Sequence, residues 1–160
     1  MSTDSTRVSG AGRLWELSER VLGACIEVHR HLGPGLLESA YERCLCHELS
    51  LTGLSFTRQV TLPVTYKGVA IDCGYRLDVV VEAELVLELK AVDRLLPVHA
   101  AQVLTYLKLT GLDVGLPVNF NTPVLREGIR RLTRRCARPP DVTLLRTPDP
   151  LSPPRLPASL

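Results

Sequence analysis

The chain has 160 residues, of which 45% are hydrophobic and 22% charged, a profile that indicates one globular domain with a sizeable core. The net charge is only +2, but it is uneven, because residues 121–160 hold eight arginines and three acidic residues. No apolar run approaches the roughly 18–20 residues of a membrane span, and the first twelve residues lack the basic and apolar regions of a signal peptide. The sequence therefore predicts a cytoplasmic protein that contacts no membrane.

The five cysteines predict reduced thiols, since their number is odd and their spacings fit no zinc framework. Cys44 and Cys46 form the only cluster, with His47. Residues two apart on a helix point about 200° apart, so these two cannot easily share a metal. We expect most of the cysteines to be small core residues.

Two helices are expected first in the chain. Residues 1–12 are small and polar and predict a disordered N-terminus. From Arg13, apolar residues recur at three- and four-residue steps up to Leu32, which predicts a helix ended by Gly33-Pro34-Gly35. A second helix is expected from near Leu36 to about Thr52.

The next segment is rich in strand signals. Apolar residues fall at alternate positions within Phe56–Tyr66, and Pro63 suggests that this strand lies at an edge or contains a bulge. Val69–Val81 predicts a longer strand in which Gly74 suggests a bulge. Its last part, from Tyr75, forms a hairpin with Leu85–Ala91 through three connecting residues.

The last elements complete a mixed architecture. A third helix is expected over Val98–Thr110, a buried strand over Val114–Phe120 and a short basic helix over Pro123–Arg135. Seven prolines fall within residues 138–160, which predicts an extended tail, with a strand conceivable at 142–145. The order ααβββαβα implies a mixed sheet flanked by helices, an α/β or α+β single domain.

Three charged residues fall within the predicted hairpin. Alternation places Glu88 and Lys90 on one face of a strand apolar enough to be central, and Asp78 lies on the preceding strand. Charges rarely enter such a place unpaired, because desolvating an ion costs several kcal/mol. A buried salt bridge and a catalytic site explain these residues equally well from spacing alone.

Read as a site, the three residues predict metal chemistry. Two carboxylates that converge from adjacent strands make a hard-oxygen site of the kind that Mg²⁺ or Mn²⁺ prefers, and the Leu89 carbonyl could add a ligand. Lys90 could then orient or help deprotonate an attacking water, or stabilise charge on a phosphate.

The uneven charge offers a second candidate surface. A basic run on the expected last helix could contact nucleic-acid phosphate, and a solvated helix face explains it as well. The residues assigned to substrate binding are Arg130, Arg131, Arg134 and Arg135.

Several motifs together resemble a known family. Asp78, followed after a gap by Glu88-Leu89-Lys90, resembles the core signature of the PD-(D/E)XK nuclease superfamily. Gly35-Leu-Leu-Glu38-Ser-Ala-Tyr41 is similar to the motif that names the GxxExxY protein family, a branch of that superfamily. Gln102-Val-Leu-Thr-Tyr106 resembles the Gln-x-x-x-Tyr helix of RecB-like nucleases.

The resemblance implies a restriction-endonuclease-like fold over residues 13–137 and a Mg²⁺- or Mn²⁺-dependent nuclease acting on nucleic acid, with DNA as the expected form. It implies Asp78, Glu88 and Glu38 as metal ligands, and Lys90, Glu38, Gln102 and Tyr106 as catalytic residues. From the residues alone, the Glu38 carboxylate could instead interact favourably with the dipole of its own helix, since it lies in the first turn. Gln102 could be a buried amide, Tyr106 a core residue, and His99 a structural hydrogen-bonding residue.

Two other functions stay open at the level of sequence. One is a non-catalytic module that binds nucleic acid or protein and retains the nuclease fold. The other is a structural Glu88–Lys90 pair in a subunit of a larger assembly. A homo-oligomer, or a protein partner bound through the proline-rich tail, is consistent with either.

Overall fold

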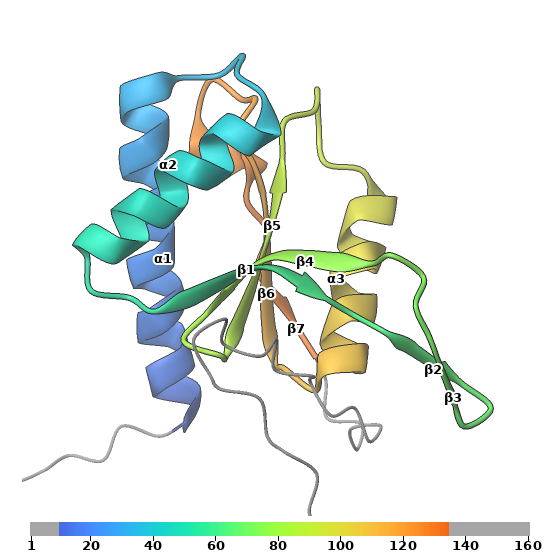
Figure 1. Cartoon of the computed structure of the whole chain (residues 1–160). Coiled ribbons are helices and arrows are strands. Elements are labelled where there is room, and N and C mark those ends of the chain that lie inside the picture. The colour runs from blue at the N-terminus through green and yellow to red at the C-terminus, as the bar shows by residue number, and fades with distance from the viewer. Residues whose placement is uncertain (1–9, 135–160) are drawn as a thin grey trace, which may run out of the picture.

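The computed structural model of the protein describes residues 10–134. Helix α1 (Gly10–Leu32) and helix α2 (Glu38–Leu51) pack together over one face of the central sheet (Figure 1). Helix α1 begins three residues before the expected start, and it buries the predicted apolar stripe. It ends where Gly33 and Gly35 take left-handed φ values of 64° and 100°, which side chains larger than glycine rarely adopt.

The central sheet has five strands in the order β1-β4-β5-β6-β7. Its bounds are β1 Phe56–Thr61, β4 Arg76–Val81, β5 Leu85–Lys90, β6 Val114–Asn119 and β7 Leu132–Thr133. Strand β5 is central: it pairs antiparallel with β4 and parallel with β6. A strand with partners on both sides and helices on both faces must be apolar, which explains why five of the six β5 residues are buried.

Helix α3 (Pro97–Thr110) makes the parallel β5–β6 connection and covers the second face of the sheet (Figure 1). It ends at Gly111, whose φ is 74°. The helix approaches β6 closely at Gly115, where an added Cβ would collide with Val103 Cγ1. The result is two core layers, one beneath α1 and α2 and one beneath α3. The architecture is a mixed α/β sheet consistent with the predicted restriction-endonuclease-like fold.

Two long strands of the prediction are wrong, because each is interrupted by residues outside any strand. Strand β1 stops at Thr61, and after Leu62 and Pro63 the chain forms β2 (Val64–Tyr66). Strand β3 (Val69–Ile71) pairs with β2 in a separate two-stranded sheet. The chain turns between β3 and β4 because Asp72 Oδ1 accepts a hydrogen bond from the Gly74 amide at 2.9 Å. Gly74 therefore belongs to a turn and not to a bulge.

The basic helix predicted over Pro123–Arg135 is also wrong. A short 3₁₀ helix, η1 (Leu125–Gly128), is followed by β7 at the edge of the sheet. The side chain of Leu125 is buried in the layer beneath α1, whereas Leu132 packs in the layer beneath α3. One helix could not reach both faces of the sheet, so the segment crosses its edge in extended form.

Some sequence predictions fall on residues beyond this range. The proline-rich tail, the strand at 142–145, Arg135 and Cys136 all lie outside the described residues. The domain limits at 13 and 137 stay predictions. Within residues 10–134, none of the helices is long and apolar enough to span a lipid bilayer.

Candidate active site

Asp78 and Glu88 meet where β4 and β5 separate. In the β4–β5 ladder Val81 is opposite Leu85 and Val79 is opposite Leu87. The next position in the same register brings Asp78 opposite Glu88. Pairing stops there, and the Leu89 amide instead donates to Asp78 Oδ2 at 2.8 Å. The opening of the ladder thus leaves room for two carboxylates at the end of a buried hairpin.

Lys90 lies on the same side of β5 as Glu88, as the alternation predicts. Leu85, Leu87 and Leu89 enter the core beneath α1 and α2, which directs Glu88 and Lys90 toward α3. Lys90 Nζ contacts Glu88 Oε1 at 3.2 Å, so the predicted ion pair exists. Glu88 is only 4% exposed, and its second oxygen, Oε2, is buried without a hydrogen-bond partner.

Glu38 brings a third carboxylate from the first turn of α2. Burial raises its pKa even though the side chain as a whole stays exposed, and the charge of Lys90 lowers it. Glu38 in turn contributes to the raised pKa values of both Asp78 and Glu88. The three carboxyls are therefore close enough to interact, although they come from residues up to 50 positions apart.

Tyr41 fixes the loop that leads to Glu38. Its hydroxyl donates to the Gly33 carbonyl at 2.6 Å and accepts from the Leu36 amide at 3.1 Å. Its fully buried ring stacks on Phe120, with centroids 4.6 Å apart. Tyr41 thus holds the start of α2 in place, while its hydroxyl bonds the loop and not the carboxylates.

The carboxylates are poorly compensated by positive charge. Burial raises the pKa of Asp78 to about 6, while the bond from the Leu89 amide lowers it and Glu38 and Glu42 raise it. Burial, and next the charge of Asp78, raises the pKa of Glu88 to about 7 against the opposing charge of Lys90. Three acids thus interact with one ammonium, and water screens Glu88 least because it is the most deeply buried of them.

This donor set fits a hard divalent cation. Its oxygens are carboxylate oxygens, one of them is buried without a donor, and the excess negative charge would be offset by a cation. Within residues 10–134, however, no three His, Cys, Asp or Glu side chains lie close enough together to hold a metal ion as they stand. One oxygen of Asp78 accepts the bond from the Leu89 amide.

Helix α3 adds a polar pair to the same region. Gln102 Nε2 donates to the Tyr106 hydroxyl at 2.8 Å. Burial raises the pKa of Tyr106, and the charges of Glu88 and Asp78 add to this rise. The structure thus brings the predicted Gln-x-x-x-Tyr face toward the carboxylates. His99 does not join them, because its Nδ1 accepts from the Leu96 amide at 3.0 Å and caps the helix.

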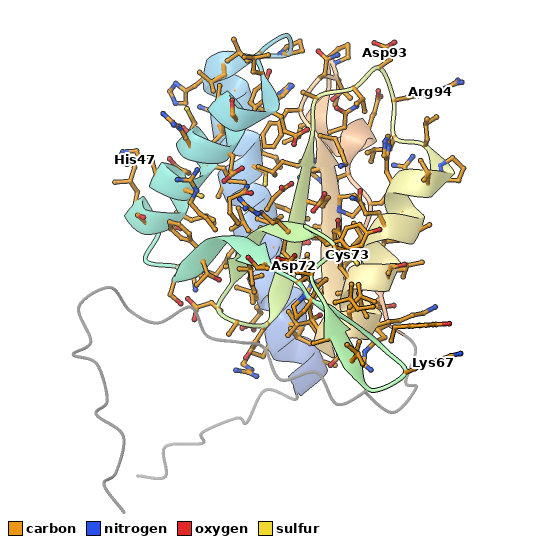
Figure 2. All side chains as sticks on the ribbon, turned by 45° about the vertical axis from the view of Figure 1, so that its right-hand side comes forward. His47, Lys67, Asp72, Cys73, Asp93 and Arg94 are labelled. Atoms are coloured by element: carbon orange, nitrogen blue, oxygen red, sulfur yellow. The ribbon has the colours of Figure 1, made fainter. Side chains whose placement is uncertain are left out.

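Sequence reasoning missed two residues that support the region. Glu42 is buried one turn after Glu38 and accepts from Arg58 at 2.9 and 3.0 Å and from Gln59 at 3.0 Å. Its four-residue spacing from Glu38 was the available signal. Asn119 is fully buried beside Lys90. Its side-chain amide accepts a hydrogen bond from the Val92 amide and donates one to the Val92 carbonyl. It fixes the chain beyond β5, where Asp93 and Arg94 turn outward (Figure 2).

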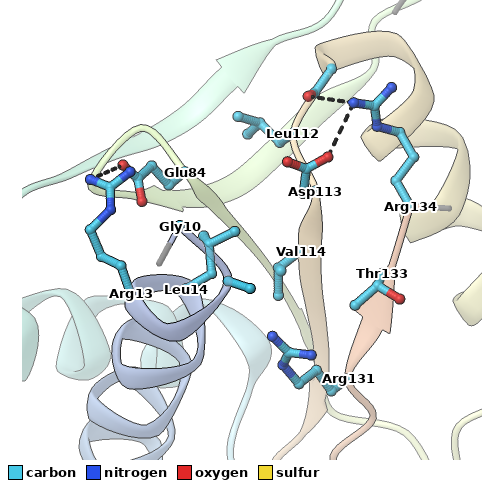
Figure 3. Close-up of a pocket in the computed structure, with 12 residues that line it drawn as sticks. Gly10, Arg13, Leu14, Glu84, Leu112, Asp113, Val114, Arg131, Thr133 and Arg134 are labelled. Carbon is cyan, nitrogen blue, oxygen red and sulfur yellow. Dashed lines mark hydrogen bonds and ion pairs between the residues drawn. The ribbon is translucent and has the colours of Figure 1, made fainter. Parts of the chain in front are cut away.

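The predicted arginine cluster is dispersed. Arg131 and Arg134 line an open pocket of about 610 Å³ at the start of β6, the end of the strand opposite to Asn119 (Figure 3). Arg131 lies over the Trp15 ring at 5.1 Å, and Arg134 bonds Asp113 and the Gly111 carbonyl. Arg130 lines a separate hollow near the start of α3 and bonds nearby carbonyls. A role of these arginines in substrate binding stays a prediction.

Comparison with known proteins gives one match. The family model described as the PD-(D/E)XK nuclease superfamily matches residues 15–132, which span both strands of the hairpin, the start of α2 and all of α3. No curated protein and no solved structure matched the chain.

Proposed function

This chain belongs to the PD-(D/E)XK nuclease superfamily, and from that membership we propose that it is a divalent-metal-dependent nuclease that hydrolyses phosphodiester bonds of nucleic acid. The observation that supports this most is the pairing of half-buried Asp78 with buried Glu88, with one oxygen of Glu88 lacking any donor and Lys90 beside it. A purely structural ion pair would not need a second acid nearby, because that acid adds repulsion.

We assign the metal ligands to Asp78, Glu88 and Glu38, with Mg²⁺ or Mn²⁺ as the ion. The raised pKa values of all three carboxyls support this assignment, because a cation among them would favour their charged forms. When bound, such an ion polarises a phosphoryl group and lowers the pKa of a water molecule.

Residues of the chain itself then orient the attacking water and the phosphate. Lys90, held by Glu88, directs the attacking water and stabilises charge that develops on the phosphate. The water oxygen forms a bond to phosphorus while one ester P–O bond breaks. The water proton passes to the surrounding acid–base groups, and the leaving oxygen takes up a proton from solvent. Gln102 and Tyr106 hold the phosphate or the water from the side of α3.

Finer assignments belong to the same proposal. Membership of the GxxExxY branch is supported by Gly35, Glu38 and Tyr41, since Tyr41 holds the loop that precedes Glu38. DNA as the substrate, magnesium as the physiological ion and a cytoplasmic location follow from the sequence interpretation. A homo-oligomer, or a partner bound through the tail, stays a prediction.

The test is cleavage by the purified protein of single- and double-stranded DNA and RNA, with Mg²⁺ or Mn²⁺ and with a chelator. We expect metal-dependent cleavage that falls at least about a hundredfold in Asp78→Asn and Lys90→Met. Both substitutions keep side-chain size, and thermal melting would verify that each variant is folded. Glu84→Gln, at the other end of β5, is the matched control and should cleave like the wild type.

Cleavage that persists undiminished in Asp78→Asn would come from a contaminant and would contradict the proposal. Failure to cleave any of the four substrates would contradict it as well. Mn²⁺ titration separates the remaining alternative: a binding module would retain affinity for nucleic acid without Mn²⁺ uptake that depends on Asp78 and Glu88.

A further inference from the structure

The hairpin of β2 and β3 projects from the body of the protein as an arm, residues 64–71 (Figures 1 and 2). Val64 pairs with Ile71 and Tyr66 with Val69, so these four side chains share one face. That face is apolar and open: Tyr66 is 60% exposed, Val69 61% and Ile71 40%. Figure 2 shows Lys67 at the tip, pointing away from the domain.

Folding of the domain does not explain this face. None of its four side chains belongs to either core layer of residues 10–134. A hairpin with three-residue strands is marginal in water on its own, and exposing its apolar face to water adds no stability. Residues 10–134 therefore leave this face free to bind a partner.

The arm is continuous with the candidate active site. The chain leaves the arm at Ile71 and reaches Tyr75, which is 48% exposed and packs edge-on against Tyr106 with ring centroids 6.4 Å apart. Three residues later it supplies Asp78. The seven residue steps from Ile71 to Asp78 span at most about 25 Å. A nucleic-acid strand bound at the carboxylates is therefore within reach of Tyr75 and the arm.

Charge and area favour a nucleic acid over a second copy of the chain. The only charged residue of the arm is Lys67, whose cation lies 5.4 Å from the Tyr66 ring centroid and suits a phosphate. A stable protein dimer needs about 800 Å² per partner, far more than four side chains on two short strands provide. Unpaired bases need much less, because each can stack on a single aromatic ring.

We propose that Tyr75 and the apolar face of the arm stack against unpaired bases, so that the substrate is nucleic acid with a single-stranded segment next to the scissile bond. This inference rests on the proposed nuclease function. It adds the class of substrate, and it assigns Tyr66 and Tyr75 to base contacts and Lys67 to a phosphate contact.

The experiment measures binding of fluorescent single-stranded and fully paired oligonucleotides by anisotropy, in a chelator and over a range of salt concentrations. We expect the single strand to bind more tightly. Tyr66→Ala and Tyr75→Ala should each weaken that binding about tenfold and leave the salt dependence unchanged, because the lost contact is apolar. Lys67→Ala should reduce the slope of log K against log salt by about 0.7, the value for one phosphate contact.

Leu51→Ala is the matched control, since Leu51 is 68% exposed at the end of α2 and belongs to no part of the arm. Equal affinity for both oligonucleotides, or tyrosine variants that bind like Leu51→Ala, would overturn the inference. So would a dimer seen by sedimentation that Tyr66→Ala dissociates. Wild-type cleavage is measured in parallel: metal-dependent cleavage without a preference for single strands refutes the arm's role alone, whereas neither binding nor cleavage refutes both proposals.

Discussion

Two clusters of charged side chains lie at opposite ends of strands β5 and β6, and they differ in burial and in charge balance. At the Lys90 end, Asp78 and Glu88 share one ammonium, and one oxygen of Glu88 is buried without a donor. At the other end each acid has its own arginine: Glu84 pairs with Arg13 at 2.7 Å, and Asp113 pairs with Arg134 at 3.1 Å (Figure 3).

The difference shows how a functional cluster is recognised among ordinary ion pairs. Exposed, balanced pairs contribute between zero and about 1 kcal/mol and need no special explanation. A buried excess of one charge lowers the stability of the fold, and it persists where something outside the folded chain offsets it. By this criterion the Lys90 end is the candidate site, although both ends hold the same residue types.

The largest effect on stability is expected at Glu42, the one fully paired acid near the Lys90 end. Glu42→Ala would remove the buried carboxylate that accepts from the more exposed Arg58 and Gln59. We expect the free energy of unfolding in urea to fall by about 3 kcal/mol, less than for a wholly buried pair because Arg58 is partly exposed. A loss as small as that of an exposed pair would remove the distinction between the two ends.

A smaller effect of opposite sign is expected at Asp78. Because the pKa values of Asp78 and Glu88 are raised on folding, the protonated acids stabilise the fold below about pH 4, and this contribution is lost as pH rises through about 6 and 7. In a chelator, Asp78→Asn should therefore be more stable than the wild type at pH 8, by about 2 kcal/mol.

The two proteins should approach equal stability near pH 4, and Mn²⁺ should raise the melting temperature of the wild type alone. Thermal melting from pH 4 to 8, with and without Mn²⁺, measures both results. An Asp78→Asn variant that is less stable than the wild type at pH 8 would mean that the carboxylate is well compensated, contrary to the comparison.

The smallest effect is expected at the balanced end. Asp113→Asn removes a charge that is 58% exposed, so the free energy of unfolding should change by less than about 1 kcal/mol. The change should shrink further in high salt, because ions screen the exposed Asp113 carboxylate, although the Arg134 side chain is only 13% exposed. Urea titration at two salt concentrations measures it, and a loss of several kcal/mol would show that exposure is a poor guide here.

Local patterns predicted the elements that hold the candidate site. Alternation in β5 was sufficient to place Glu88 and Lys90 on one face, and the three helices end within one residue of where the sequence predicted. The spacing of Gln102 and Tyr106 likewise predicted one helix face. These features depend on residues within one or two turns of each other, so a single sequence contains the information.

Features set by contacts between distant segments could not be predicted. The sequence predicted a helix after Pro123, but Leu125 and Leu132 pack on opposite faces of the sheet, which only the finished sheet defines. Glu42 meets Arg58 from another element, and Tyr41 stacks on Phe120, 79 residues later. No local pattern marks either pair, so the support around Glu38 became visible only in the structure.

The parallel pairing of β5 with β6 has a consequence for the order of synthesis. Strand β5 emerges first, and its second neighbour exists only after α3 and residues 114–119 have followed. Until then the strand with Glu88 and Lys90 is an edge strand, without the Phe120 amide bond to the Lys90 carbonyl and without Asn119 beside it. The surroundings of Lys90 are therefore completed only after residues 114–119 have been synthesised.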